Sequence, residues 1–216
     1  AGRAADPTPL SGRELTEFRS IIGVLQWLSG QTRPDLSAGV SLTQTQEPGV
    51  EQLRAAYSLM SYARQTSEVG VHIQPLDLHN LAVASYGDSS WANASENKTQ
   101  IGALVILTER TAAFRPAPAS VVEWKSRRTQ RVVRSTLAGE SMACDTSIDL
   151  GFITKVAMEE LVYNRKATLS SSIRVGTMDI PDDEQIPLFA ITDCKSLFDA
   201  VNQIARVVGN EVDADG

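Results

Sequence analysis

Three acidic residues stand where they can share metal ions: Asp88, Glu140 and Asp193. Asp88 follows an alternating apolar stretch from Leu81 to Gly87, which is typical of a strand, and Asp193 follows a second apolar stretch. Glu140 lies near the start of a segment with helical periodicity. Hard divalent cations prefer carboxylate oxygens, and a pair of them can hold the oxygens of a phosphoryl displacement. The order strand-end Asp, helix Glu, strand-end Asp therefore suits a two-metal nuclease site.

The segments around these residues predict an α/β fold with a mixed sheet. The expected elements are three antiparallel strands, a long helix, a fourth strand and a further helix, at residues 81–87, 100–107, 121–125, 135–163, 188–192 and 196–204. A strand–helix–strand crossover is right-handed and returns the last strand parallel to its neighbour. If the fourth strand pairs with the first, Asp88 and Asp193 lie one strand spacing apart, about 5 Å. We expect Glu140 to reach the same edge of the sheet.

The long helix carries one apolar stripe in its sequence. The stripe consists of Met142, Leu150, Ile153, Ala157 and Leu161. Such a stripe is typical of the buried side of an amphipathic helix. Acidic residues such as Glu159 lie outside this stripe, and so does Glu140.

The residues before the sheet predict a separate helical unit. Apolar spacing indicates helices from residue 11 or 14 to 28, from about 32 to 47, and from about 53 to 65. We expect a tail at residues 1–12, a helical unit at 13–66, a linker at 67–80 and the sheet domain at 81–216.

The charge of the chain is unevenly distributed. The net charge is −6, which argues against generic nucleic-acid binding. Between residues 110 and 134, however, seven basic residues face one acid, Glu123. The basic residues are Arg110, Arg115, Lys125, Arg127, Arg128, Arg131 and Arg134. A basic strip near an acidic metal site is consistent with contacts to a phosphate backbone. A solvated hairpin is the alternative.

Several classes of protein and site are excluded or disfavoured. No apolar run approaches the length of a membrane span, so we expect no membrane association. The first residues have no apolar signal-peptide core and no initiating Met, which predicts an intracellular fragment or processed piece. Cys144 and Cys194 are isolated, which argues against a disulfide framework or a zinc site.

Five segments resemble the polyproteins of copia-type retrotransposons. YGDSSWA at 86–92 resembles the first catalytic block of their ribonuclease H domain, Tyr-Ser-Asp-Ala-Asp-Trp-Ala. VEWKSRR at 122–128 resembles the Trp-Lys-Ser-Lys-Lys strand end, and STLAGESMA at 135–143 resembles the start of the catalytic helix. The stretch from IPL at 186–188 through Asp193 to Ser196 resembles a later catalytic strand. Upstream, VLQWLSGQTRPDLSAGVS at 24–41 resembles the end of the family's reverse transcriptase.

The resemblance implies a ribonuclease H-like domain that follows the end of a reverse transcriptase. It implies that Asp88, Glu140 and Asp193 are the catalytic metal ligands, for two Mg²⁺ or Mn²⁺ ions, and that the substrate is an RNA–DNA hybrid. The rest of the polyprotein would be the partner. The resemblance also favours the basic strip as a nucleic-acid contact, with Lys125, Arg127, Arg128, Arg131 and Arg134 as the candidates. Ser196 is a further candidate, although a helix cap is its more common role.

The chain also departs from the family pattern. Ser90 and Ala138 stand where the family has acidic residues. The family's segment with the fourth carboxylate, Arg-Thr-Lys-His-Ile-Asp, has no match, and Asp213 is the candidate at about the right distance. These departures predict a domain that is incomplete at its C-terminus.

Other interpretations of the same residues stay open. Asp88 is also typical of a turn after a strand, Glu140 can complement a helix N-terminus, and Asp193 or Ser196 can cap a helix. An inactive, truncated or decayed module that only binds nucleic acid or partner domains is the alternative function. An integrase-like nuclease fits less well, because that class has its acids in the order Asp-Asp-Glu.

Overall fold

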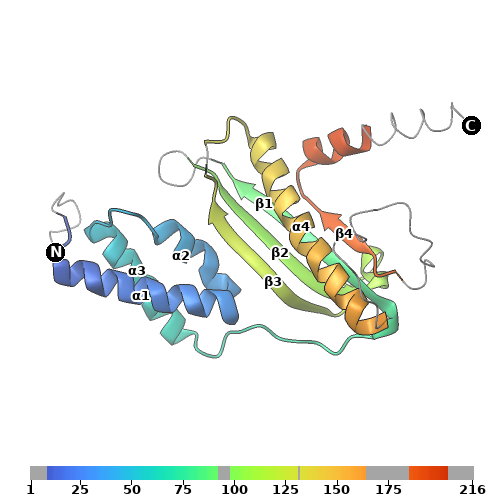
Figure 1. Ribbon diagram of the computed structural model, residues 1–216, viewed down its shortest axis with the longest axis horizontal. Helices are drawn as coiled ribbons and strands as arrows, with labels where there is room; N and C mark the ends of the chain where they lie inside the picture. The colour runs from blue at the N-terminus through green and yellow to red at the C-terminus, as the bar shows by residue number, and fades with distance from the viewer. Residues whose placement is uncertain (1–8, 92–97, 131, 164–184, 204–216) are drawn as a thin grey trace, which may run out of the picture.

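A helical unit precedes a four-stranded sheet in the computed structural model of the protein (Figure 1). The structure describes residues 9–91, 98–130, 132–163 and 185–203. The helical unit consists of α1 (Gly12–Gln31), the 3₁₀ turn η2 (Pro34–Leu36), α2 (Ser37–Thr43) and α3 (Val50–Gln65).

Helix α1 begins at a reciprocal cap and packs through one apolar face. The Ser11 hydroxyl accepts from the backbone N–H of Glu14, and the Glu14 carboxylate accepts from the N–H of Ser11. This arrangement satisfies two N–H groups that have no partner within the helix. Phe18, Ile22 and Leu25 recur at helical spacing and are buried. They contribute to two small clusters shared with α2 and α3.

A buried arginine joins the turn after α1 to the end of α3. Arg33 is 3% exposed and forms a two-pronged ion pair with Asp35, at 2.8 and 2.9 Å. Its guanidinium also donates to the carbonyl and the hydroxyl of Thr66, at 2.9 and 2.7 Å, and lies over the ring of Tyr62. The hydrogen bond from Arg33, opposed by burial, holds the pKa of the Asp35 carboxyl below its ordinary value.

The sheet has the predicted mixed topology. Its strands are β1 (Leu81–Ser90), β2 (Gln100–Glu109), β3 (Ala119–Arg128) and β4 (Leu188–Ile191), in the spatial order β3-β2-β1-β4. The β1–β2 and β2–β3 pairs are antiparallel, and β4 pairs with β1 in parallel. The α/β class and the crossover are confirmed, and the arrangement is consistent with a ribonuclease H-like fold.

Helix α4 (Thr136–Tyr163) covers one face of β1 and β2, but not through the predicted stripe (Figure 1). Of the predicted stripe, only Leu150 packs against the core cluster of the sheet. Met142, Ile153, Ala157 and Leu161 are exposed, so the stripe as a whole was wrong. The residues that α4 buries are mostly small and recur every four positions: Gly139, Ala143, Ser147 and Gly151. Small side chains allow the helix axis to approach the sheet closely, and this approach decides which face is buried.

Glu159 was also expected outside the buried face of α4, and it is 8% exposed. One of its carboxylate oxygens accepts from the backbone N–H of Ile186 at 3.0 Å and from the Lys155 ammonium at 2.6 Å. These partners compensate the cost of burying the carboxylate. Because Ile186 is fully buried just before β4, Glu159 fixes where the chain enters that strand.

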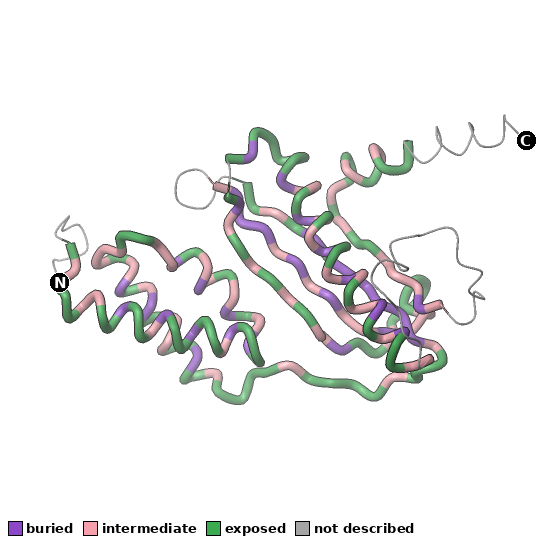
Figure 2. Tube along the Cα trace, viewed as in Figure 1, coloured by how far each residue is buried: buried purple, intermediate pink, exposed green. Residues whose placement is uncertain are grey.

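The helical unit contacts the sheet along β3. The indole Nε1 of Trp124 donates to the carbonyl of Ser29 at 2.6 Å. The side-chain amide of Gln100 donates to the hydroxyls of Ser41 and Ser126, at 3.0 and 2.8 Å. Figure 2 shows that burial is concentrated on the central strands and on the inner sides of the helices. No described helix combines the length and the apolarity that crossing a membrane requires.

Candidate metal centre

The carboxylates of Asp88, Glu140 and Asp193 converge at one edge of the sheet. One oxygen from each of the three lies within 4.8 Å of the other two. The residues come from β1, from the first turns of α4 and from the segment after β4. Three carboxylate oxygens at this spacing can bind a divalent cation, and the ligand set is not specific for one metal.

The parallel pairing of β1 and β4 positions the two aspartates. Tyr86 and Ile191 are Cα partners at the end of this ladder. Asp88 and Asp193 each follow two residues later, so both side chains leave the same end of adjacent strands. Both residues are exposed, and they leave the site open to solvent and to a ligand.

Glu140 supplies the inner part of the centre. Its Oε1 accepts a hydrogen bond from the Ser89 hydroxyl at 2.7 Å. Its Oε2 is buried and has no hydrogen-bond partner among the described residues. A buried anionic oxygen without a donor is costly, and a cation bound between the three carboxylates would remove that cost. The unpartnered Oε2 therefore supports a metal ion here, in addition to the clustering of three acidic residues.

Two glycines allow α4 to come close enough for Glu140 to reach the aspartates. A Cβ atom on Gly87 would lie 2.6 Å from the backbone carbon and oxygen of Ala143. A Cβ atom on Gly139 would lie 2.8 Å from the Ser89 hydroxyl. Real Cβ contacts are not that short, so a larger residue at position 87 would push the helix away from β1. A larger residue at position 139 would displace the Ser89 hydroxyl that donates to Glu140.

Ser89 and Gly87 are site residues that the sequence reasoning did not identify. Both flank Asp88, and their roles depend on α4, which is remote in the sequence. Small residues recur every four positions in α4, and this pattern could have indicated the face that packs on the sheet. The prediction followed the larger apolar residues instead.

Cys144 lies one turn after Glu140 in α4, and its thiol has a raised pKa. Burial raises the pKa of its thiol, and the negative charges of Asp145 and Glu140 raise it further. The thiol is therefore held in its neutral form.

The residues expected to contact nucleic acid do not form one continuous strip. Lys125 and Arg127 are exposed on β3, and Arg127 donates weakly to the Thr146 hydroxyl at 3.5 Å. Arg128 points the other way and donates to the carbonyl of Gln44 in the helical unit. Strand alternation directs Arg127 and Arg128 to opposite faces, although Lys125, Arg127 and Arg128 all line one cleft beside the helical unit.

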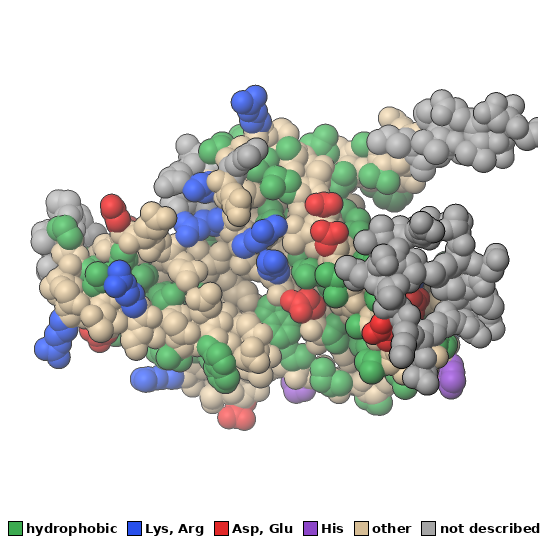
Figure 3. Space-filling model, viewed as in Figure 1, with side chains coloured by type: hydrophobic (Ala, Val, Ile, Leu, Met, Phe, Trp, Pro, Cys, Tyr) green, Lys and Arg blue, Asp and Glu red, His purple; other side chains and the backbone are tan. Residues whose placement is uncertain are grey.

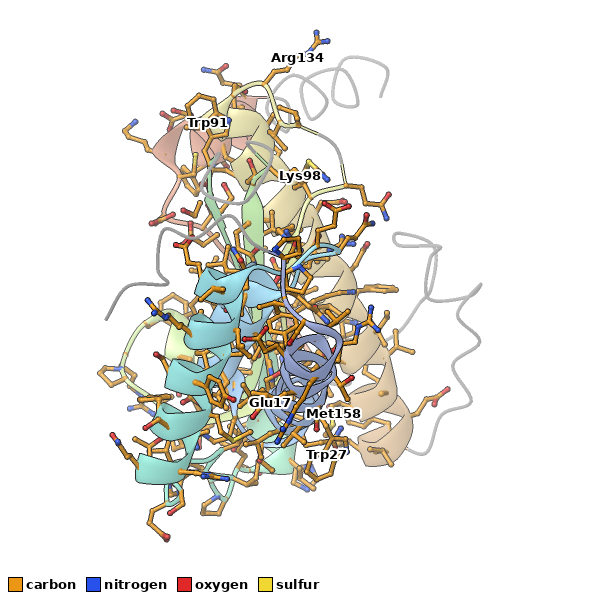
Figure 4. The ribbon with its side chains drawn as sticks, turned by 90° about the vertical axis from the view of Figure 1, so that its left-hand side faces the viewer. Glu17, Trp27, Trp91, Lys98, Arg134 and Met158 are labelled. Atoms are coloured by element: carbon orange, nitrogen blue, oxygen red, sulfur yellow. The ribbon has the colours of Figure 1, made fainter. Side chains whose placement is uncertain are left out.

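The remaining predicted site residues lie away from β3 or outside the described residues. Arg134 is exposed and projects from one end of the molecule (Figure 4). Ser196 is exposed in the first turn of a helical segment at 195–203. Arg131 and Asp213 lie outside the described residues.

Comparisons with known proteins give no independent assignment. No protein-family model matches the chain, and no curated protein or solved structure is significantly similar to it.

Proposed function

We propose that the protein is a metal-dependent ribonuclease that hydrolyses the RNA strand of an RNA–DNA hybrid. The observation that carries this proposal is the convergence of Asp88, Glu140 and Asp193 around the buried, unpartnered oxygen of Glu140. The mixed sheet and the motif order support the same conclusion. The helical unit then corresponds to the end of a copia-type reverse transcriptase, whose other parts are its partners.

Each carboxylate has a distinct part in this proposal. Asp88 and Asp193, being exposed, would bind the two Mg²⁺ or Mn²⁺ ions from the solvent side of the cluster. Glu140 would bind through Oε2, while the Ser89 hydroxyl donates to its other oxygen. When bound, the ions supply charge stabilisation and an activated water for in-line attack on phosphorus. Contacts with 2′-hydroxyl groups would restrict cleavage to RNA. Attack of water on phosphorus would leave a 3′-hydroxyl on one product and a 5′-phosphate on the other.

A hydrolysis assay with one substitution tests the proposal. The chain is incubated with a labelled RNA–DNA hybrid and Mg²⁺ or Mn²⁺, and the RNA products are resolved by length and end group. We expect Asp88→Asn to abolish cleavage, because it removes a metal-binding charge at nearly constant shape. Asp149→Asn is the matched control, since Asp149 is exposed on α4 outside the cluster, and it should cleave normally. Cleavage by Asp88→Asn would place the chemistry elsewhere.

A non-catalytic module that binds nucleic acid is the second candidate. It is favoured by the cations on β3, which can contact phosphates whether or not the carboxylates hold metal. Intact hybrid binding by a wild-type chain that cleaves nothing with either metal would select this candidate.

A further inference from the structure

The backbones of the two aspartates in the metal centre are held in different ways. Asp88 lies inside β1, a central strand of the sheet, and its Cα partner on β2 is Gly102. Asp193 lies outside the sheet, because the ladder between β1 and β4 ends at the pair Tyr86 and Ile191. The place of Asp193 therefore depends on the short segment that follows β4.

The helical segment at 195–203, which comes directly after this turn, is poorly packed. None of its residues is buried, and Phe198 and Val201 are 61% and 57% exposed. Figure 1 shows the segment beyond the end of β4, and Figure 3 shows hydrophobic side chains at its surface. Its ion pair between Lys195 and Asp199, at 2.6 Å, is internal. Burial of this segment therefore contributes little to holding Asp193 in place.

The carboxylate of Asp193 is likewise not held by a neighbour. No hydrogen bond or ion pair among the described residues involves it, whereas Glu140 accepts from the Ser89 hydroxyl. It does not cap the helical segment, where the carbonyl of Cys194 accepts the first helical bond, from the N–H of Phe198 at 3.0 Å. The direction of the Asp193 side chain is thus set by its backbone.

One hydroxyl spans the turn that contains Asp193. Thr192 Oγ1 accepts a hydrogen bond from the backbone N–H of Cys194 at 3.1 Å. Threonine hydroxyls that bond to the backbone two residues further on stabilise tight turns. The residue before Asp193 is thereby tied to the residue after it, and the end of β4 is joined to the start of the helical segment.

We propose that Thr192 is a positioning residue of the metal centre, whose hydroxyl holds the turn that directs the Asp193 carboxylate toward Asp88 and Glu140. The inference rests on the proposed function, since it requires that the three carboxylates bind metal. An ion bound by all three selects the conformations in which all three face it, and its apparent affinity falls with the fraction of such conformations. Loss of the hydroxyl would lower that fraction and leave the ion with two fixed ligands.

Two substitutions separate the hydroxyl of Thr192 from the shape of its side chain. Thr192→Val keeps the branched shape and the strand preference but cannot accept a hydrogen bond, whereas Thr192→Ser keeps the acceptor. Thr16→Val is the matched control, because Thr16 is exposed on α1 and its hydroxyl donates to the carbonyl of Gly12 in the helical unit.

The measurement is calorimetric titration of the full chain with Mn²⁺. We expect Thr192→Val to bind about tenfold more weakly, as is typical when a group that orients a metal ligand is lost, and Thr192→Ser and Thr16→Val to bind like the wild type. Hydrogen exchange at the N–H of Cys194 should become faster in Thr192→Val alone. Wild-type affinity in Thr192→Val overturns the inference, and so does a serine variant that binds as weakly as the valine variant.

The relative affinity for Mg²⁺ and Ca²⁺ is a readout that a merely structural role would not change. Mg²⁺ requires nearly ideal octahedral geometry, whereas Ca²⁺ accepts flexible arrangements of oxygen ligands. Competition of each ion with Mn²⁺ should therefore show that Thr192→Val loses more affinity for Mg²⁺ than for Ca²⁺. Equal losses for the two ions would assign Thr192 to general stability and overturn the positioning role.

Failure of this inference differs from failure of the proposed function. A chain whose Mn²⁺ affinity depends on the Thr192 hydroxyl but that cleaves no hybrid retains the inference and removes the ribonuclease. Cleavage by the wild type, with unchanged Mn²⁺ affinity in Thr192→Val, removes the positioning role and leaves the ribonuclease. A wild-type chain that binds no Mn²⁺ overturns both.

Discussion

Asp88 and Asp193 each lie two residues beyond Tyr86 and Ile191, which are Cα partners in the parallel ladder between β1 and β4. The register of one strand pair thus sets the separation of two metal ligands. A slip of one residue would turn every side chain of β4 to the opposite face. Substitutions of the residues that fix this register and that position Glu140 therefore test the site.

Loss of Asp88 should remove metal binding without unfolding the chain. A metal that binds only the folded state raises its melting temperature. We expect Mn²⁺ to stabilise the wild type and Asp149→Asn, and to leave the melting temperature of Asp88→Asn unchanged. Differential scanning fluorimetry with and without Mn²⁺ measures this. Equal stabilisation of all three chains would show that the ion binds at another place.

Removal of the Ser89 hydroxyl should weaken the metal site indirectly. Ser89 donates to Oε1 of Glu140, and groups that orient a metal ligand typically contribute 10- to 100-fold to affinity. Calorimetric titration with Mn²⁺ should give an affinity for Ser89→Ala that is lower by about tenfold or more. Ser90→Ala, at the exposed neighbouring position, serves as the comparison and should bind like the wild type. A normal affinity for Ser89→Ala would contradict the positioning role.

A methyl group at Gly87 should separate α4 from β1. The new Cβ would lie 2.6 Å from the backbone of Ala143, and we expect a loss of about 1–3 kcal/mol in the free energy of unfolding together with weaker Mn²⁺ binding. Gly102→Ala is the control on the adjacent strand, where the atom closest to an added Cβ, the backbone oxygen of Asp88, lies 3.9 Å away. Urea denaturation gives the free energy of unfolding of both variants. A loss in Gly87→Ala alone supports close packing against α4, whereas an equal loss in Gly102→Ala would mean that the sheet does not tolerate alanine in place of glycine in general.

The anchor of β4 should depend on the carboxyl oxygen of Glu159. Glu159→Ala leaves the buried N–H of Ile186 without its acceptor, which typically costs about 1–3 kcal/mol. Glu159→Gln keeps a carbonyl acceptor and should lose less. Urea denaturation gives the free energies, and hydrogen exchange at the N–H of Ile186 localises the effect. Equal stability of Glu159→Ala and the exposed control Glu160→Ala would exclude this anchor.

The Arg33–Asp35 pair should give the helical unit a defined pH dependence. The pKa of Asp35 is lowered in the folded state, so its stabilisation is complete above the unfolded value of about 3.9 and is lost as the pH falls through the folded pKa. Wild type should exceed Asp35→Asn in unfolding free energy at neutral pH, and the difference should shrink below about pH 4. A difference that stays constant down to pH 3 would rule out the ion pair as its source.

The strand order and the three carboxylates were predictable because they depend on local patterns. Alternating apolar residues mark β1, and the crossover rule places β4 beside it. The buried face of α4 was not predictable in this way. Hydrophobic periodicity favours large residues, whereas the first half of α4 meets the sheet through Gly139, Gly151 and the small residues between them. Large residues such as Leu150 and Met158 pack on the sheet only further along the helix.

The parts of the site that sequence reasoning did not provide are those that depend on long-range contacts. The bond between Ser89 and Glu140 exists only once α4 lies on β1. The burial of Glu159 depends on the return of the chain at Ile186. Arg128 was grouped with its neighbours by sequence, yet strand alternation turns it toward Gln44.

The pairing of β4 with β1 also bears on the order of folding. The two strands are separated by roughly a hundred residues of chain, whereas β1, β2 and β3 are consecutive and the helical unit is built from neighbouring segments. Closing so long a loop is entropically costly, so we expect the β4 ladder to form after the antiparallel hairpins. Asp193 reaches Asp88 only in that step. Nascent or partly folded chains would therefore lack the complete carboxylate set, and the ability to hold metal would arise together with the last stage of folding.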